Sequence, residues 1–238
     1  MSSAVVFGAG GGIGRALTEA LAASGRFDRI HAGARRLPGD LPAGVEPFAF
    51  DLGDEASIAE VAHSIGGQVE LVLIASGVLQ DASHAITPEK SFRAIDAEAM
   101  AQVLAINTVG PALIAKHFLP LLPRDRRAVF AALSARVGSI GDNRLGGWHS
   151  YRASKAALNM LIVNFAIELK RSHPHTIVAA LHPGTVDTEL SLPFQRGVAP
   201  DRLFTPATAA GHLLTVIDAL APADSGGLFA WDGTRLPS

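Results

Sequence analysis

Short apolar runs typical of β-strands alternate with helical stretches along the whole chain. The expected strands are residues 4–8, 29–34, 46–51, 70–75, 128–133, 176–181 and 228–231. The expected helices are residues 14–24, 56–65, 99–118, 151–171 and 206–220. Because this alternation favours crossovers between parallel strands, we predict an α/β fold with a Rossmann-type, doubly wound, mostly parallel seven-stranded sheet. No repeat or linker interrupts the pattern, so residues 1–238 are expected to form a single domain.

The composition supports a large buried sheet and excludes several kinds of function. Hydrophobic residues make up 48% of the chain, which suits strands that are buried on both faces. No stretch approaches the roughly 18 apolar residues of a spanning helix, and the start lacks a signal peptide, so we expect a cytoplasmic protein with no membrane contact. A net charge of −2 offers no field for nucleic acid. Cysteine is absent and the nine histidines lack metal-ligand spacing, so we expect no metal site.

A glycine-rich segment joins the first expected strand to the first expected helix. Gly8, Gly12 and Gly14 have the spacing G-x-x-x-G-x-G, with Ile13 between the last two. Glycine lets the backbone turn sharply and approach a pyrophosphate closely, at the N-terminus of the helix that follows. This position predicts a dinucleotide-binding loop, and a simple flexible turn is the alternative.

The end of the second expected strand indicates which dinucleotide binds. An acidic residue there would bind the ribose hydroxyls of NAD, whereas arginine suits the additional phosphate of NADP. The chain has Arg35 and Arg36 at this point and no carboxylate. Guanidinium groups pair with phosphate in a fork geometry, so we predict NADP(H), with Arg35 favoured over Arg36. Binding of NAD(H) remains the alternative, as does a pair of arginines that only end a strand in solvent.

Tyr151 is the single tyrosine of the chain and precedes Lys155 by four residues on an expected helix. This spacing places both side chains on one helix face. A phenol has a pKa near 10, and a neighbouring ammonium group is expected to lower it. We therefore predict that Tyr151 is a catalytic acid or base and that Lys155 assists it.

The full segment Tyr151-Arg152-Ala153-Ser154-Lys155, together with the glycine spacing, resembles the short-chain dehydrogenase/reductase family over essentially the whole chain. Residues 146–155 resemble its carbonyl-reductase and C-factor-like branch. The resemblance implies that Asn107 supports a proton-relaying water beside Lys155. It also implies further contacts with the cofactor, which the family makes through residues after the third, fourth and sixth strands: Asp51, Leu52, Ala75, Gly77, Pro183, Val186 and Thr188.

Two segments depart from the family pattern. Phe7 stands where family members often have threonine, and Ile74-Ala75-Ser76-Gly77 replaces an N-N-A-G sequence. The catalytic serine is also out of place, because strict register puts Ala135 in its position. Ser134 is the preferred candidate, since a bulge at the strand end could re-aim it, and Ser139 or no serine at all are the alternatives.

These features predict an NADPH-dependent oxidoreductase that reduces a carbonyl group by hydride transfer. The segment 189–204 is expected to form a lid through its apolar residues Leu190, Leu192, Pro193, Phe194 and Phe204, which favours a small hydrophobic aldehyde, ketone or enone. A packed surface loop is the alternative. The alternative is an NADP-binding signalling or interaction protein with weak or no catalysis. The resemblance further implies a homodimer or homotetramer.

Overall fold

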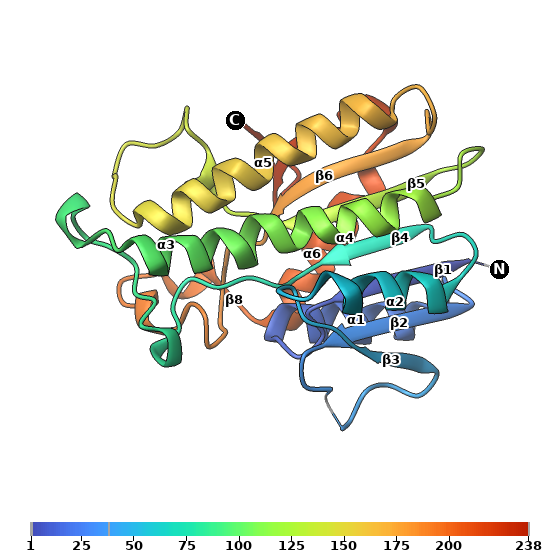
Figure 1. Ribbon diagram of the computed structural model, residues 1–238, viewed down its shortest axis with the longest axis horizontal. Coiled ribbons are helices and arrows are strands. Elements are labelled where there is room, and N and C mark those ends of the chain that lie inside the picture. Colours follow the sequence, from blue (N-terminus) through green and yellow to red (C-terminus); the bar gives the residue numbers. More distant parts are fainter. Residues whose placement is uncertain (1, 38, 238) are drawn as a thin grey trace.

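The computed structural model describes residues 2–37 and 39–237, which form an eight-stranded sheet with helices on both faces (Figure 1). The strands are β1 (Ser3–Phe7), β2 (Arg29–Ala34), β3 (Val45–Ala49), β4 (Leu71–Ile74), β5 (Ala128–Leu133), β6 (Thr176–His182), β9 (Leu228–Ala230) and β10 (Arg235–Leu236). Their order is β10-β9-β6-β5-β4-β1-β2-β3, and only the pairing of β10 with β9 is antiparallel. The predicted doubly wound sheet is confirmed, with β10 as an additional edge strand of two residues.

The helices divide between the two faces of the sheet. They are α1 (Gly12–Ser24), α2 (Glu55–Ile65), α3 (Ala97–Leu104), α4 (Gly110–Phe118), α5 (His149–Leu169) and α6 (Pro206–Ala219). Helices α1 and α6 pack together over one hydrophobic cluster, while α2, α4 and α5 cover the other (Figure 1). Strands buried on both faces account for the nearly continuous apolar runs in the sequence.

The longest helix is continuous but not uniform. A π-helical turn, Ala105–Val109, joins α3 to α4, and the amide of Gly110 donates to the carbonyl of Ala105. Such turns widen the helix locally and are frequent at functional sites. The buried Asn107 lies within this turn. The break in the regular helix therefore lies just before Pro111.

The same helix corrects the expectation about membrane spans. Residues 97–121 form one helix that, by length and composition alone, is long and apolar enough to cross a membrane. The expectation that no stretch is long and apolar enough to span a membrane is therefore wrong for this segment. In the structure α3 packs against α5 and α4 packs against α2, and 28% of the most apolar stretch of this helix is buried.

Phe7 occupies the position where the family often has threonine, and packing explains the difference. Its ring makes edge-to-face contacts with Phe48, Phe50 and Phe118, at centroid distances of 5.3, 5.0 and 4.9 Å. The neighbouring strand accommodates this cluster only because Gly33 lacks a side chain, since a Cβ there would lie 2.0 Å from the Phe48 ring. Aromatic packing thus replaces a hydroxyl directly beneath the glycine-rich loop.

The carboxyl ends of the parallel strands meet at one edge of the sheet, to which the arrows of β2 and β4 point in Figure 1. The chain order reverses between β1 and β4, and ligands of doubly wound sheets bind outside such a reversal. The segments predicted to bind the cofactor follow β1, β2, β3, β4 and β6 at this edge.

Candidate active site

The glycine-rich loop after β1 has a conformation that requires its glycines. Gly8 has a φ of 94°, and the amides of Gly8 and Ala9 both donate to the carbonyl of Gly33, at 2.8 and 2.9 Å. A Cβ on Gly14 would lie 2.1 Å from the Gly8 carbonyl oxygen. Helix α1 then starts from Gly11 without a side-chain cap or an acidic residue in its first turn. Its free amides therefore suit a phosphate group, as a dinucleotide requires.

The segments after β4 and β6, both predicted to contact the cofactor, lie beside this loop. A Cβ on Gly12 would lie 2.8 Å from the methyl group of Thr188, which follows β6. A Cβ on Gly14 would lie 3.2 Å from the side chain of Ala75, which follows β4. The buried Val186 lies between Pro183 and Thr188, on the short strand β7 (Thr185–Val186). The structure thus brings the loops after β1, β4 and β6 together, and their contact with a cofactor stays a prediction.

The arginines after β2 are exposed and available for an anion. Neither Arg35 nor Arg36 has an ion-pair partner within residues 2–37 and 39–237. The nearby Arg15, in contrast, is bound to Asp40 at 2.5 Å and also pairs with Glu19. Arg35 and Arg36 therefore remain the predicted contacts for an additional phosphate.

The segment after β3 is ordered by its own polar groups. The Asp51 carboxylate accepts the amide of Gly53 at 2.8 Å. Leu52 packs so tightly against the helix turn at Gly110 that a Cβ there would lie 2.7 Å from the leucine side chain. Contacts within the chain thus hold both residues in place, and their predicted contact with the cofactor stays a prediction.

The side chain of Asn107 forms hydrogen bonds with both the loop after β4 and helix α5. Its side-chain oxygen accepts the amide of Val78, and its side-chain nitrogen donates to the carbonyl of Val78, both at 2.8 Å. The same nitrogen donates to the hydroxyl of Ser154 at 3.1 Å. A Cβ on Gly77 would lie 3.3 Å from Asn107 Oδ1 and 3.5 Å from Lys155 Nζ. The structure thus brings together Asn107, Gly77 and Lys155.

Lys155 is buried and joins α5 to the end of β5. Its ammonium group donates to the carbonyl of Leu133 at 2.9 Å, and its Nζ lies 5.8 Å from the centre of the Tyr151 ring. Burial lowers the pKa of Lys155 to about 8 and raises the pKa of Tyr151 to about 12. The expected lowering of the tyrosine pKa is therefore reversed, because loss of solvent outweighs the nearby ammonium group. At neutral pH the phenol keeps its proton and can act as an acid.

Ser134 does not turn toward Tyr151 in this conformation. The pairing of β5 with β6 advances one residue at a time to Leu133, without the bulge that could re-aim the serine. The buried hydroxyl of Ser134 instead donates to Asn159 Oδ1 at 2.7 Å. Asn159 lies two turns beyond Tyr151, about 12 Å along the helix axis. Ser139 is also engaged, since its hydroxyl accepts the amide of Asp142.

The segment 189–204 contacts the start of helix α5 through aromatic side chains. The ring of Phe194 packs edge-to-face on Trp148 at 4.9 Å, and Trp148 in turn lies 6.3 Å from the Tyr151 ring. Phe204 packs elsewhere, against His212 and Trp231. Trp148 was not among the predicted site residues, although it lies only three residues before Tyr151.

Comparison with known sequences identifies similar proteins over most of the chain. A sequence model described as short chain dehydrogenase matches residues 2–197. The 1-hydroxy-2-glutathionyl-2-methyl-3-butene dehydrogenase of Rhodococcus sp. (strain AD45) is 32% identical over 242 residues, which cover 99% of both chains. The C-signal of Myxococcus xanthus is 35% identical over 143 residues, which cover 60% of this chain and 81% of that protein.

Solved structures agree with this assignment. The NADPH-bound carbonyl reductase from chicken fatty liver has a TM-score of 0.83 and 25% identity, covering 99% of this chain and 94% of its own. The carbonyl reductase Sniffer of D. melanogaster has a TM-score of 0.85 and 22% identity with complete coverage of both chains, which shows a shared fold.

The buried ammonium group of Lys155 predicts a stability that rises with pH. Between about pH 8 and 10 the folded protein releases this proton while the unfolded chain keeps it, so the free energy of unfolding should rise by roughly 2 kcal/mol. The raised pKa of Tyr151 opposes this only above about pH 10, where the unfolded phenol ionises. Urea unfolding across this range should show the rise in the wild type but not in Lys155→Met. The control variant Lys90→Met, at an exposed position, should show the same rise in the free energy of unfolding as the wild type. An equal rise in Lys155→Met would contradict the burial of the Lys155 ammonium group.

Proposed function

The chain belongs to the short-chain dehydrogenase family, and on this basis we propose that it is an NADPH-dependent oxidoreductase that reduces carbonyl groups. The observation that carries the proposal is the protonated phenol of Tyr151 beside the buried Lys155, at the sheet edge where the glycine-rich loop also lies. The NADPH named for the chicken carbonyl reductase supports the choice of cofactor.

The residues that would hold the cofactor come from five loops along this edge. They are Gly8, Gly12, Ile13, Gly14, Arg35, Arg36, Asp51, Leu52, Ala75, Gly77, Pro183, Val186 and Thr188, together with Tyr151 and Lys155. Bound NADPH would supply a hydride to the carbonyl carbon. The uncapped N-terminus of α1 fits the pyrophosphate, and the unpaired arginines fit the additional phosphate.

Tyr151 would supply the proton that completes the reduction. Its hydroxyl donates to the carbonyl oxygen as that oxygen gains negative charge, which yields an alcohol and leaves a phenolate. The ammonium group of Lys155 stabilises this phenolate through its positive charge. Asn107 forms hydrogen bonds with both the loop after β4 and helix α5, and the family resemblance implies that it supports a relay water beside the lysine.

We propose a small apolar aldehyde, ketone or enone as the substrate. Phe194 and Trp148 form an apolar contact beside Tyr151, which suits a lid that excludes water. The hydroxy compound in the name of the Rhodococcus relative supports an alcohol or carbonyl group at the reacting carbon. NAD(H) is the competing cofactor.

A second candidate function is cofactor binding with little catalysis, for signalling or interaction. The observation that favours it is the engagement of Ser134 with Asn159 while Ala135 occupies the usual catalytic position. The name of the C-signal relative also supports a signalling function. The two candidates differ in whether the chain turns over a carbonyl substrate.

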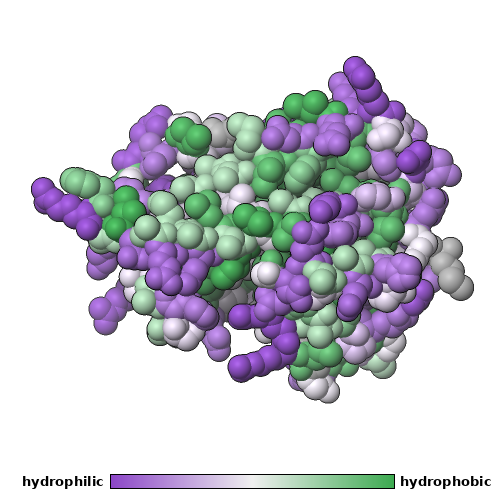
Figure 2. Space-filling model, viewed as in Figure 1, coloured by the Kyte–Doolittle hydropathy of each residue, from purple (hydrophilic) through white to green (hydrophobic). Residues whose placement is uncertain are grey.

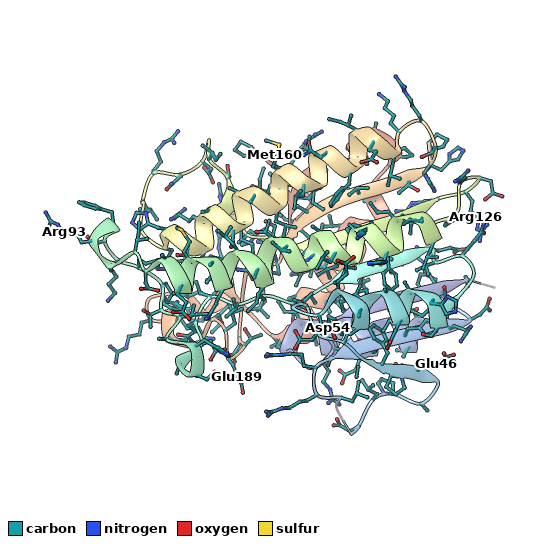
Figure 3. The ribbon with its side chains drawn as sticks, in the orientation of Figure 1. Glu46, Asp54, Arg93, Arg126, Met160 and Glu189 are labelled. Carbon is teal, nitrogen blue, oxygen red and sulfur yellow. The ribbon has the colours of Figure 1, made fainter. Side chains whose placement is uncertain are left out.

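We also propose a cytoplasmic homodimer or homotetramer that associates through the outer face of α4 and α5. Hydrophobic side chains gather over these helices in Figure 2, and Val109, Met160 and Ile167 are at least half exposed. Met160 points away from the sheet on α5 in Figure 3. Burying such a face between copies of the chain would remove apolar surface from water.

Removing the hydroxyl of Tyr151 tests the enzyme proposal directly. Tyr151→Phe should lower kcat for NADPH oxidation by at least about 100-fold, since general acid catalysis contributes on that order. The assay should use a panel of apolar aldehydes, ketones and enones, with cofactor affinity measured separately by fluorescence. Tight cofactor binding without turnover of any panel member would instead establish the second candidate.

The preference for NADPH should depend on Arg35. Replacing it with alanine removes a charge-assisted contact with the additional phosphate, so the Kd of NADPH should rise by about tenfold or more. The Kd of NADH should stay the same because it lacks this phosphate. Arg93→Ala is the matched control, since Arg93 is exposed on a different loop (Figure 3). Tighter binding of NADH than NADPH by the wild type would overturn the assignment.

Restoring a serine at residue 135 should increase catalysis. Ala135→Ser places a hydroxyl at the family's position, and one such donor is worth about 100-fold in rate, so a rise in kcat of about tenfold is a conservative expectation. Ser134→Ala should change kcat by less than about threefold, because its hydroxyl is bonded to Asn159. A large loss in Ser134→Ala would restore the original assignment of this residue.

A further inference from the structure

Helix α5 begins without a cap of its own. Its preceding residue, Trp148, has a φ of 51° and provides no side-chain hydrogen bond. The first amides of any helix lack partners within the helix and need acceptors from elsewhere. Tyr151 is the third residue of this helix, so the way its first turn is held determines where the phenol lies.

Glu89, in the loop after β4, supplies the missing acceptors. Its main-chain carbonyl accepts the amide of Trp148 at 2.6 Å. Its carboxylate accepts the amide of Ser150, with oxygen–nitrogen distances of 3.2 and 3.3 Å, and also the hydroxyl of Ser150. One residue thus holds both ends of the turn that leads into Tyr151, from 61 positions away in the sequence.

The burial of this carboxylate requires an explanation. Glu89 is only 6% exposed and Ser150 only 4%. A buried charge is costly unless hydrogen bonds and opposite charge compensate for the lost water. The positive end of the α5 dipole and the two donors of Ser150 provide that compensation. The arrangement therefore has the character of a cap supplied by another part of the chain.

The contact lies directly against the reactive side chain. Glu89, Ser150 and Tyr151 line one small cavity, which is completed by apolar residues that include Leu79 and Val103. The charged groups near the phenol are the carboxylate of Glu89 from the loop and the ammonium group of Lys155 from α5 itself. Removing the Glu89 side chain would both free the helix turn and open this cavity to water.

We propose that Glu89 is a positioning residue for Tyr151, clamping the first turn of α5 to the loop after β4. Together with Asn107, which binds the same loop at Val78, it makes the loop and the helix a single unit. Its effect on catalysis rests on the proposed reductase function. The hydrogen bonds that form the clamp do not depend on that function.

The single tyrosine of the chain provides a direct test. Absorbance at the phenolate band against pH reports Tyr151 alone, while circular dichroism monitors the fold. The wild type should titrate near 12, because burial raises the pKa of Tyr151. In Glu89→Ala the midpoint should fall toward 10, since the phenol becomes more accessible to water and burial is the cause of its raised pKa.

Kinetics and matched variants complete the experiment. Glu89→Ala should lower kcat by about tenfold or more, since small misplacements of reacting groups have such effects, while the KM for NADPH changes little. Glu89→Gln should retain most of kcat because its amide oxygen can still accept the Ser150 amide. The control is Asp54→Ala, which removes the cap of a different helix, α2 (Figure 3), and should leave kcat and the titration unchanged.

The outcomes separate this proposal from the proposed function. If Glu89→Ala behaves like Asp54→Ala in both readouts, Glu89 is an ordinary helix cap and the proposal is wrong. If the wild type reduces no carbonyl, the reductase function fails, but the titration still decides whether the clamp exists. Should Glu89→Ala not fold, Ser150→Ala loosens the same contact and should lower the titration midpoint by a smaller amount.

Discussion

The burial of the Lys155 ammonium group is the constraint on which the rest of the site depends. The group is held against the carbonyl of Leu133, where α5 meets the end of β5, and loss of solvent shifts its pKa downward. The same dry environment shifts the pKa of Tyr151 upward, so the proton stays on the phenol at neutral pH. A reductase needs an acid at this position, and the arrangement supplies one before any ligand binds.

Much of the fold follows from the alternation of strands and helices, because it recurs over the whole length. The edge strand β10 has two residues, too few to show a period, and was missed. The π-helical turn at Asn107 was also missed, since its sequence is compatible with an ordinary helix. The length and apolar character of residues 97–121 were underestimated, because Gln102, Asn107 and Thr108 interrupt the apolar run in the sequence.

Local spacing identified the Tyr151–Lys155 pair and the glycine-rich loop, because their chemistry depends on neighbours in the sequence. The direction of Ser134 and the role of Glu89 could not be predicted in this way. Each depends on a partner supplied by a distant element, Asn159 in one case and Ser150 in the other. The sign of the Tyr151 pKa shift depends on burial, which one sequence does not reveal.

The proposed reaction transfers a hydride from NADPH to a carbonyl carbon while Tyr151 supplies the proton. The most direct measurement uses NADPH deuterated at the transferring position of C4 and follows the alcohol product by mass spectrometry. We expect the alcohol formed from an apolar carbonyl compound to contain one deuterium on its former carbonyl carbon. An alcohol product without the label, formed while the cofactor is consumed, would contradict the proposed hydride transfer.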